Sequence, residues 1–143
     1  MGITIHYLGK LDNSELTKRV IVELTEISKE LEWEFELIDD ETKEIKGIVI
    51  KPHTNSEFLS FIFDNIGELK NIAVLSHDLP FGNDFSHVSI KTQFAPIEIH
   101  VTIIKLLKYL KQKYISDLKV YDEGRYWDTD NKIPLPASRK IVT

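Results

Sequence analysis

The segment from residue 121 to 131 concentrates side chains of the kinds that bind ligands. Its sequence, YDEGRYWDTDN, holds four carboxylates, one arginine, one glycine and the adjacent aromatic residues Tyr126 and Trp127 within eleven residues. Amphipathic aromatic rings beside charged groups on a loop are typical of sites that hold one face of a ligand and fix its orientation. The candidate ligand-binding residues of this segment are Asp122, Glu123, Arg125, Tyr126, Trp127 and Asp128.

A purely structural role for the same segment stays open. Tyr126 and Trp127 would then pack back against the sheet and anchor a terminal segment, while the carboxylates remain in water. A calcium-binding loop is excluded by the spacing, because Asp128 and Asp130 fit the first and third ligand positions but Lys132 occupies the fifth.

His100 is the seventh candidate, because it falls on the apolar stripe of a predicted helix over residues 96–114. A titratable ring on a surface that faces the core can serve as an acid–base group or bind a ligand. It can also be neutral and hydrogen-bonded to a backbone carbonyl, since buried polar groups are usually paired. The sequence leaves both interpretations open.

Other chemical motifs are weak or absent in the sequence. It has no cysteine, no Gly-x-Ser-x-Gly turn, no phosphate-binding glycine loop, and no His-x-His, His-x-x-x-His or His-Glu-x-x-His spacing among its five histidines. His6 and His87 fall in different predicted strands, on the faces opposite their apolar neighbours. We therefore expect no metal site and no cofactor.

Two helices and seven strands are predicted to position these residues. Residues 16–31 carry apolar side chains at spacings of four, four, three and four, and residues 96–114 carry a second stripe, so each is expected to be a helix with one buried face. Alternating or strand-like composition predicts strands at residues 3–7, 33–37, 46–50, 57–63, 69–75, 87–93 and 118–121.

These elements predict an α+β fold with two layers. The short links in the middle of the chain require antiparallel pairing, so we expect one curved antiparallel sheet with both helices on one face. Over about residues 3–115, the order of strands and helices resembles the helix-grip arrangement of TATA-box-binding-protein repeats. The resemblance lies in element order alone. We expect one domain over residues 1–121, with an irregular C-terminal segment, 122–143, packed on it.

Composition and charge restrict the class of protein. With 143 residues and 16.6 kDa the chain is the size of one domain, and its net charge of −5 argues against general binding to nucleic acid. No apolar run suggests a membrane span, and Met1–Lys10 does not resemble a signal peptide, so we expect a cytoplasmic protein. Residues 12–44 contain 12 acidic and 4 basic residues, whereas residues 105–119 contain five lysines and one aspartate.

We favour a non-enzymatic intracellular binding or interaction domain. Its expected site is a groove between the sheet and the second helix, with His100 in the wall and residues 122–130 as a cover. One alternative is a small hydrolase-type enzyme that uses His100 or His53 with Asp122, Glu123 or Asp128. Another is an acidic inhibitor or immunity-type protein that binds a basic partner. The expected partner is thus a small molecule or a basic protein rather than nucleic acid or a membrane, and a homodimer stays open.

Overall fold

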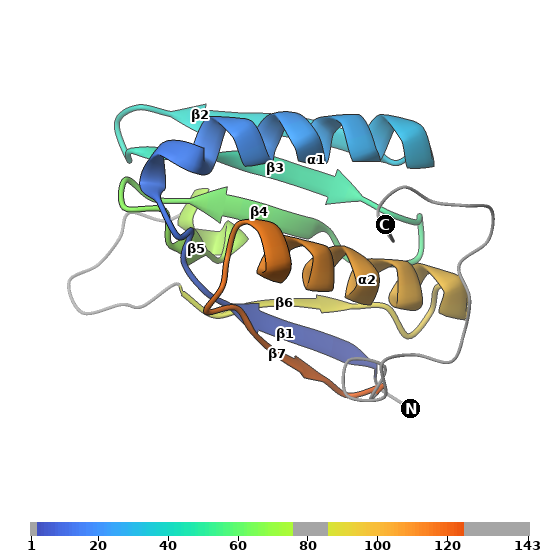
Figure 1. Cartoon of the computed structure of the whole chain (residues 1–143). Coiled ribbons are helices and arrows are strands. Elements are labelled where there is room, and N and C mark those ends of the chain that lie inside the picture. The colour runs from blue at the N-terminus through green and yellow to red at the C-terminus, as the bar shows by residue number, and fades with distance from the viewer. Residues whose placement is uncertain (1–2, 76–85, 125–143) are drawn as a thin grey trace.

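Seven β-strands and two α-helices make up the described part of the computed structural model, which comprises residues 3–75 and 86–124 (Figure 1). The strands are β1 (Thr4–Leu8), β2 (Glu34–Asp40), β3 (Ile45–Lys51), β4 (Leu59–Phe63), β5 (Leu69–Lys70), β6 (Val88–Lys91) and β7 (Lys119–Asp122). The helices are α1 (Thr17–Leu31) and α2 (Ile97–Lys113), with the short 3-10 helices η1 (Ser14–Leu16) and η2 (Ile72–Leu75). The α+β class predicted from the sequence is confirmed.

The strands form two antiparallel sheets, with strand orders β6-β1-β7 and β2-β3-β4-β5. Hydrogen bonds join the sheets at both ends. The N–H of Leu69 donates to the carbonyl of Gly9 over 3.0 Å, and at the opposite end the N–H of Glu57 donates to the carbonyl of Lys91 over 3.1 Å. Between these junctions β4 and β6 belong to separate sheets. The strands that were expected to form one curved antiparallel sheet therefore form two antiparallel sheets, and the division lies between β4 and β6.

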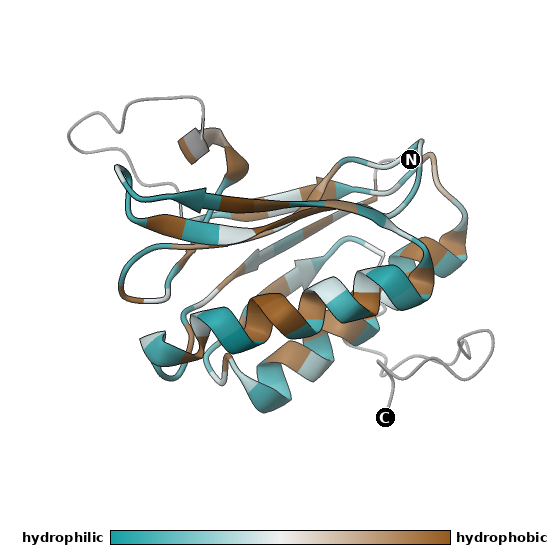
Figure 2. Cartoon of the chain, turned by 90° about the horizontal axis from the view of Figure 1, so that it is seen from above, coloured by the Kyte–Doolittle hydropathy of each residue, from teal (hydrophilic) through white to brown (hydrophobic). Residues whose placement is uncertain are grey.

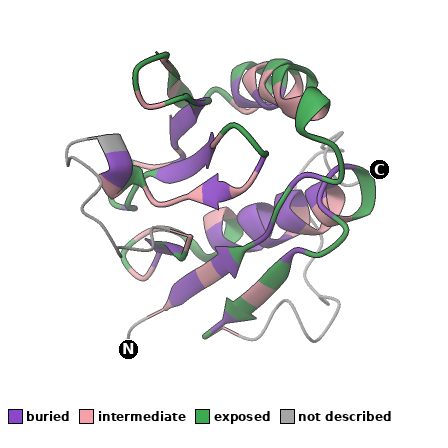
Figure 3. Cartoon of the chain, turned by 90° about the vertical axis from the view of Figure 1, so that its left-hand side faces the viewer, coloured by how far each residue is buried: buried purple, intermediate pink, exposed green. Residues whose placement is uncertain are grey.

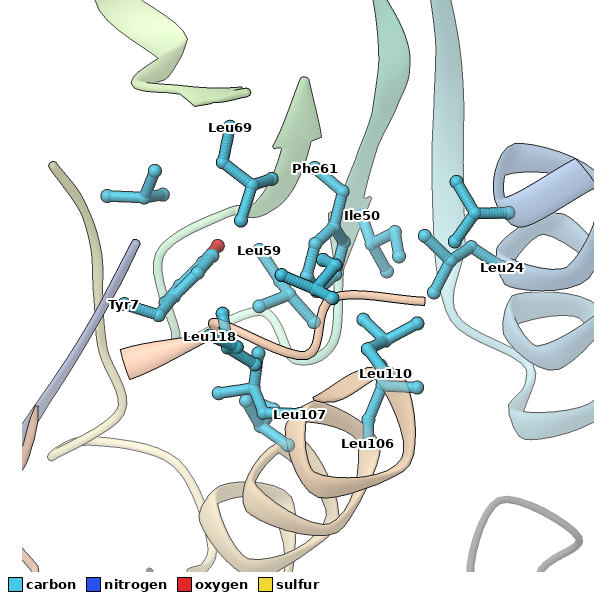
Figure 4. Packing of buried hydrophobic residues seen from close by; sticks show 14 of the residues in the cluster. Tyr7, Leu24, Ile50, Leu59, Phe61, Leu69, Leu106, Leu107, Leu110 and Leu118 are labelled. Atoms are coloured by element: carbon cyan, nitrogen blue, oxygen red, sulfur yellow. The ribbon is translucent and has the colours of Figure 1, made fainter. Parts of the chain in front are cut away.

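Both helices lie on the same side of the strands, as predicted (Figure 2). Leu24 of α1 and Leu107 of α2 are each 0% exposed and belong to one buried apolar cluster. Phe61 of β4 contributes to the same cluster, and Figure 4 shows these three side chains reaching into it from their separate elements. Removal of this apolar surface from water holds the helical layer on the sheets.

The sheet β2-β3-β4-β5 also carries a smaller apolar cluster on its other face. Ile45, Val49, Ile62 and Val74 are buried together there, and Ile38 packs against them. Val74 belongs to η2, so this short helix covers part of a face that lies opposite α1 and α2. As a result β4 is buried along its whole length, whereas the edge strand β2 is exposed or half-buried (Figure 3).

The strand predicted over residues 69–75 is wrong beyond Lys70, where η2 replaces it. Asn71 explains the change, because its side chain accepts the N–H of Ala73 over 2.9 Å and its carbonyl accepts the N–H of Val74 over 3.0 Å. An asparagine that bonds the backbone two residues ahead favours a turn over an extended strand. The apolar run Ile72–Leu75 therefore forms a helical turn, and Val74 on this turn is buried against the sheet.

A polar cluster joins the two helices at their outer side. Glu23 of α1 accepts hydrogen bonds from the hydroxyls of Tyr109 and Tyr114, and the ammonium of Lys113 lies 3.3 Å from its carboxylate. Partial burial acts to raise the pKa of Glu23, but the two hydroxyls and the ammonium outweigh burial and hold this pKa below its usual value. Burial and the hydrogen bond to the Glu23 carboxylate raise the pKa of Tyr114 to about 12.

Candidate functional site

His100 lies in the first turns of α2 and is bonded at both ring nitrogens. Its Nδ1 is 2.6 Å from the hydroxyl of Thr92, and its Nε2 is 2.7 Å from a carboxylate oxygen of Asp122. Thr92 follows β6 and Asp122 ends β7, so both residues stand at the end of the three-stranded sheet where β1 begins. The side chains of His100 and Asp122 are each 1% exposed. The cluster Thr92–His100–Asp122 therefore ties α2 to two strands from within the core.

The partners of His100 indicate how its protons are arranged. A carboxylate only accepts hydrogen bonds, so Nε2 of His100 carries a hydrogen that it donates to Asp122. In a neutral ring Nδ1 then accepts from the hydroxyl of Thr92. Asp122 also accepts the backbone N–H of Gly124 over 2.7 Å. His100 is thus a hydrogen-bonded buried histidine, and the bonds at its ring nitrogens go to side chains where the sequence suggested a backbone carbonyl.

Hydroxyl, imidazole and carboxylate in a row is also the arrangement that activates nucleophiles in hydrolases. Here the hydroxyl belongs to Thr92, a residue that is 2% exposed. A substrate therefore has no access to this oxygen in the structure. This burial favours a structural role for the cluster, in which it holds α2 against the strands.

The structure brings two of the seven candidate residues, His100 and Asp122, into contact. Glu123 faces a different group, because its Oε2 is 3.5 Å from Nε2 of His6 and its Oε1 accepts the N–H of Thr4 over 3.2 Å. The remaining candidates lie outside the described residues, and their role stays a prediction: Arg125, Tyr126, Trp127 and Asp128.

The space between the sheets and α2, where the sequence suggested a groove, is filled by the apolar cluster. Ile103, Ile104, Leu107 and Leu110 of α2 are 0–1% exposed. A groove of about 470 Å³ lies instead between β4 and β6, at the division of the sheets. Its lining includes Lys51, Glu57, Phe58, Ser60, Asn71 and Ser89.

Strand alternation places this groove on the face away from the helices. Ser60 alternates with Leu59 and Phe61, which belong to the helix-side cluster, so its side chain points to the opposite face. Ser89 alternates in the same way with the buried Val88 and Ile90. We call this region the β4–β6 groove.

Tyr7 of β1 forms a hydrogen bond across the division of the sheets to Ser60, which lines the groove. The Tyr7 hydroxyl donates to the backbone carbonyl of Ser60 over 2.7 Å, which shows that this carbonyl is directed away from β3. Burial raises the pKa of Tyr7, so the hydroxyl keeps its hydrogen and remains a donor at physiological pH. The inner wall of the groove is thus held by a bond between the two sheets.

Sequence reasoning did not find the β4–β6 groove, nor the contact between His6 and His87, whose ring nitrogens are 3.1 Å apart. Both features depend on which strands become neighbours across the two sheets, and local periodicity does not report that. The alternation of Ser60 and Ser89 with apolar residues marks them as facing away from the core, but it does not show that they share one groove.

Comparisons with known proteins do not extend this description. No family model matches the sequence, no curated protein matches it significantly, and no solved structure does so either. Among the described residues, no helix is both long and apolar enough to cross a membrane.

Proposed function

We propose that this chain is a non-enzymatic binding domain whose ligand occupies the β4–β6 groove. The observation that carries the proposal is the place of this groove, at the division of two sheets and on the face opposite α1 and α2. Its volume of about 470 Å³ suits a small organic molecule. Hydrogen bonds at both ends of the division and the bond from Tyr7 to Ser60 hold the walls in place, and rigid elements position binding groups well.

The lining favours a small polar molecule with one flat apolar part. Phe58 is 50% exposed, with the Lys51 ammonium 4.7 Å from the centre of its ring, and Ser89 offers a hydroxyl. The Asn71 amide is bonded to the N–H of Ala73 and to the carbonyl of His87, so it shapes the wall of the groove. Lys51 and Glu57 add one charge of each sign. A neutral or zwitterionic ligand matches this balance better than a polyanion does.

Protein-observed NMR, in which the backbone amide signals are followed while the members of a panel of amino acids, nucleosides and monosaccharides are added one at a time, tests this proposal. We expect a member of the panel to bind and to shift the backbone amide signals of Ser60 and Ser89. Ser89→Phe should fill the groove and abolish binding, whereas Thr54→Phe, on an exposed turn, should bind as the wild type does. Binding that survives Ser89→Phe, or signal changes confined to other regions, would contradict the proposal.

A hydrolase-type enzyme is the second candidate, and the row Thr92–His100–Asp122 is the observation that favours it. An opening motion would have to expose Thr92. A fluorophosphonate probe, which labels activated hydroxyls, should then label the wild type and fail to label Thr92→Val and His100→Gln. Absence of labelling in the wild type would remove this candidate.

A cytoplasmic location is part of the proposal. It fits a binding domain for a small metabolite, and fractionation of cells that express the chain from its own gene tests it. Recovery in the membrane or secreted fraction would contradict this location.

A further inference from the structure

Two histidines meet on the face of the sheet β6-β1-β7 that lies away from the helices. His6 belongs to β1 and pairs in register with Ser89 of β6, and His87 lies two residues before Ser89. Because alternate residues of a strand share a face, both imidazoles project on the same side. Nδ1 of His6 is 3.1 Å from Nε2 of His87, and the ring planes are 81° apart. The His6 side chain is 29% exposed, and His87 is exposed as well.

We propose that His6 and His87 together bind a divalent transition-metal ion of the zinc type through these two nitrogens. A zinc ion lies about 2.0–2.1 Å from an imidazole nitrogen, so two such ligands at a tetrahedral angle are about 3.3–3.4 Å apart. The nitrogens of His6 and His87 are within a few tenths of an ångström of that separation. A small rotation of two partly exposed side chains therefore lets a metal ion replace the hydrogen shared by the rings.

Glu123 supplies the feature that distinguishes this pair from two adjacent surface histidines. Its Oε2 lies 3.5 Å from Nε2 of His6, the nitrogen that faces away from His87. Its Oε1 accepts the N–H of Thr4, and the Glu123 N–H donates to the carbonyl of Thr4 over 3.0 Å, so the carboxylate is fixed against β1. A carboxylate on the far nitrogen of a metal-binding histidine favours the tautomer whose other nitrogen has a free lone pair. That lone pair, on Nδ1 of His6, is directed at His87.

The chemistry of the donors selects the kind of ion. Imidazole nitrogen suits Zn²⁺, Cu²⁺ and Ni²⁺, whereas Mg²⁺ and Ca²⁺ require oxygen ligands. Within residues 3–75 and 86–124 there is no group of three or more His, Cys, Asp or Glu side chains arranged to hold a metal. The pair therefore provides two ligands, and water completes the coordination.

Calorimetric titration of untagged protein with ZnCl₂ tests the proposal, with MgCl₂ as the comparison ion. We expect one saturable Zn²⁺ site and no Mg²⁺ binding. His6→Gln and His87→Gln should each weaken Zn²⁺ binding by about tenfold or more, and Glu123→Gln should weaken it less than either. His53→Gln is the matched control, because His53 lies in a separate turn, where its Nδ1 accepts the N–H of Asn55. The His53→Gln variant should bind Zn²⁺ with the affinity of the wild type.

The nitrogen NMR signals of the histidine rings give a second measurement on the wild-type protein, which does not depend on how any variant folds. Zn²⁺ should shift Nδ1 of His6 and Nε2 of His87 and leave the ring nitrogens of His53 unchanged. The proposal is overturned if Zn²⁺ shows no saturable binding, if His53→Gln loses as much affinity as the pair variants, or if the shifted nitrogens belong to other histidines.

Discussion

At the scale of single residues, Thr92 is the simplest place to test what the buried cluster contributes. Thr92→Val keeps the shape of the side chain and removes the hydroxyl that lies 2.6 Å from Nδ1 of His100. Loss of a hydrogen-bond partner for a buried polar group is expected to lower the free energy of unfolding by about 1–3 kcal/mol. Urea unfolding measures this change. Thr54→Val, on an exposed threonine, should leave stability unchanged, and equal effects of the two substitutions would show that the Thr92 hydroxyl contributes nothing specific.

The environment of Glu23 predicts how the stability of the protein changes in acid. The pKa of Glu23 is lowered in the folded protein, so its carboxylate contributes stability above the pKa of the unfolded chain. That contribution is lost as the pH falls through the lower folded value. Glu23→Gln should therefore reduce stability near neutral pH and make the melting temperature fall less steeply below about pH 4.5.

Thermal unfolding at a series of pH values compares Glu23→Gln with the wild type. Glu26→Gln is the control, because Glu26 is an exposed glutamate on the same helix three residues further on. If Glu23→Gln and Glu26→Gln give the same acid profile, the hydrogen bonds of Tyr109 and Tyr114 to Glu23 do not couple stability to pH.

Part of the candidate site could be predicted from the sequence, and the reason is visible in two residues. His100 was predicted to face the core because it lies on the apolar stripe of its helix. Asp122 was a candidate because of its charged, aromatic segment, and the sequence placed it just after a strand that in fact includes it as the last residue of β7. Thr92 and the pair His6–His87 were not predicted as partners, because their contacts depend on strand neighbours that are far apart in the sequence. Local spacing carries no information about such long-range register.

At the scale of elements, the helices were predicted within one or two residues because each carries a long apolar stripe. By residue type, either Asp12 or Asn13 could cap the segment that leads into α1. In the structure Asn13 accepts the N–H of Glu15 and begins η1, while Asp12 accepts the N–H and the hydroxyl of Ser116. Two neighbouring residues that both cap helices well are not distinguished by type alone. The choice depends on Ser116, a contact between segments distant in the chain.

Leu107 tests whether the stripe of α2 holds the helical layer on the sheets. It is 0% exposed, so Leu107→Ala should lower the free energy of unfolding by about 2–5 kcal/mol through lost apolar contact and a residual cavity. Leu37 of β2 is 56% exposed, and Leu37→Ala should change stability by less than about 0.5 kcal/mol. Chemical unfolding of both variants gives the comparison. A small effect at Leu107 would mean that the helix does not need this contact.

At the scale of the whole molecule, charge is distributed unevenly over the fold. The acidic segment 12–44 includes α1 and the edge strand β2, whereas the lysines of segment 105–119 lie on and after α2. The cluster of Glu23 with Tyr109, Tyr114 and Lys113 joins the two regions. Glu23 therefore contributes to the contact between the helices, and variants that change the charge of the acidic surface should keep Glu23 unchanged.

Exposed acidic residues of α1 and β2 predict a salt-sensitive interaction if this surface binds a basic protein. Glu26, Glu36 and Asp39 are exposed, so replacing all three by lysine should reverse local charge without removing core contacts. Proteins retained by the immobilised wild type through this surface should be lost with the triple variant and with rising salt, because screening limits the field to about 8 Å at physiological ionic strength. Replacement of the same residues by glutamine should give intermediate retention. Equal recovery of the same proteins by all three forms, at low and at high salt, would exclude the acidic surface as a binding site.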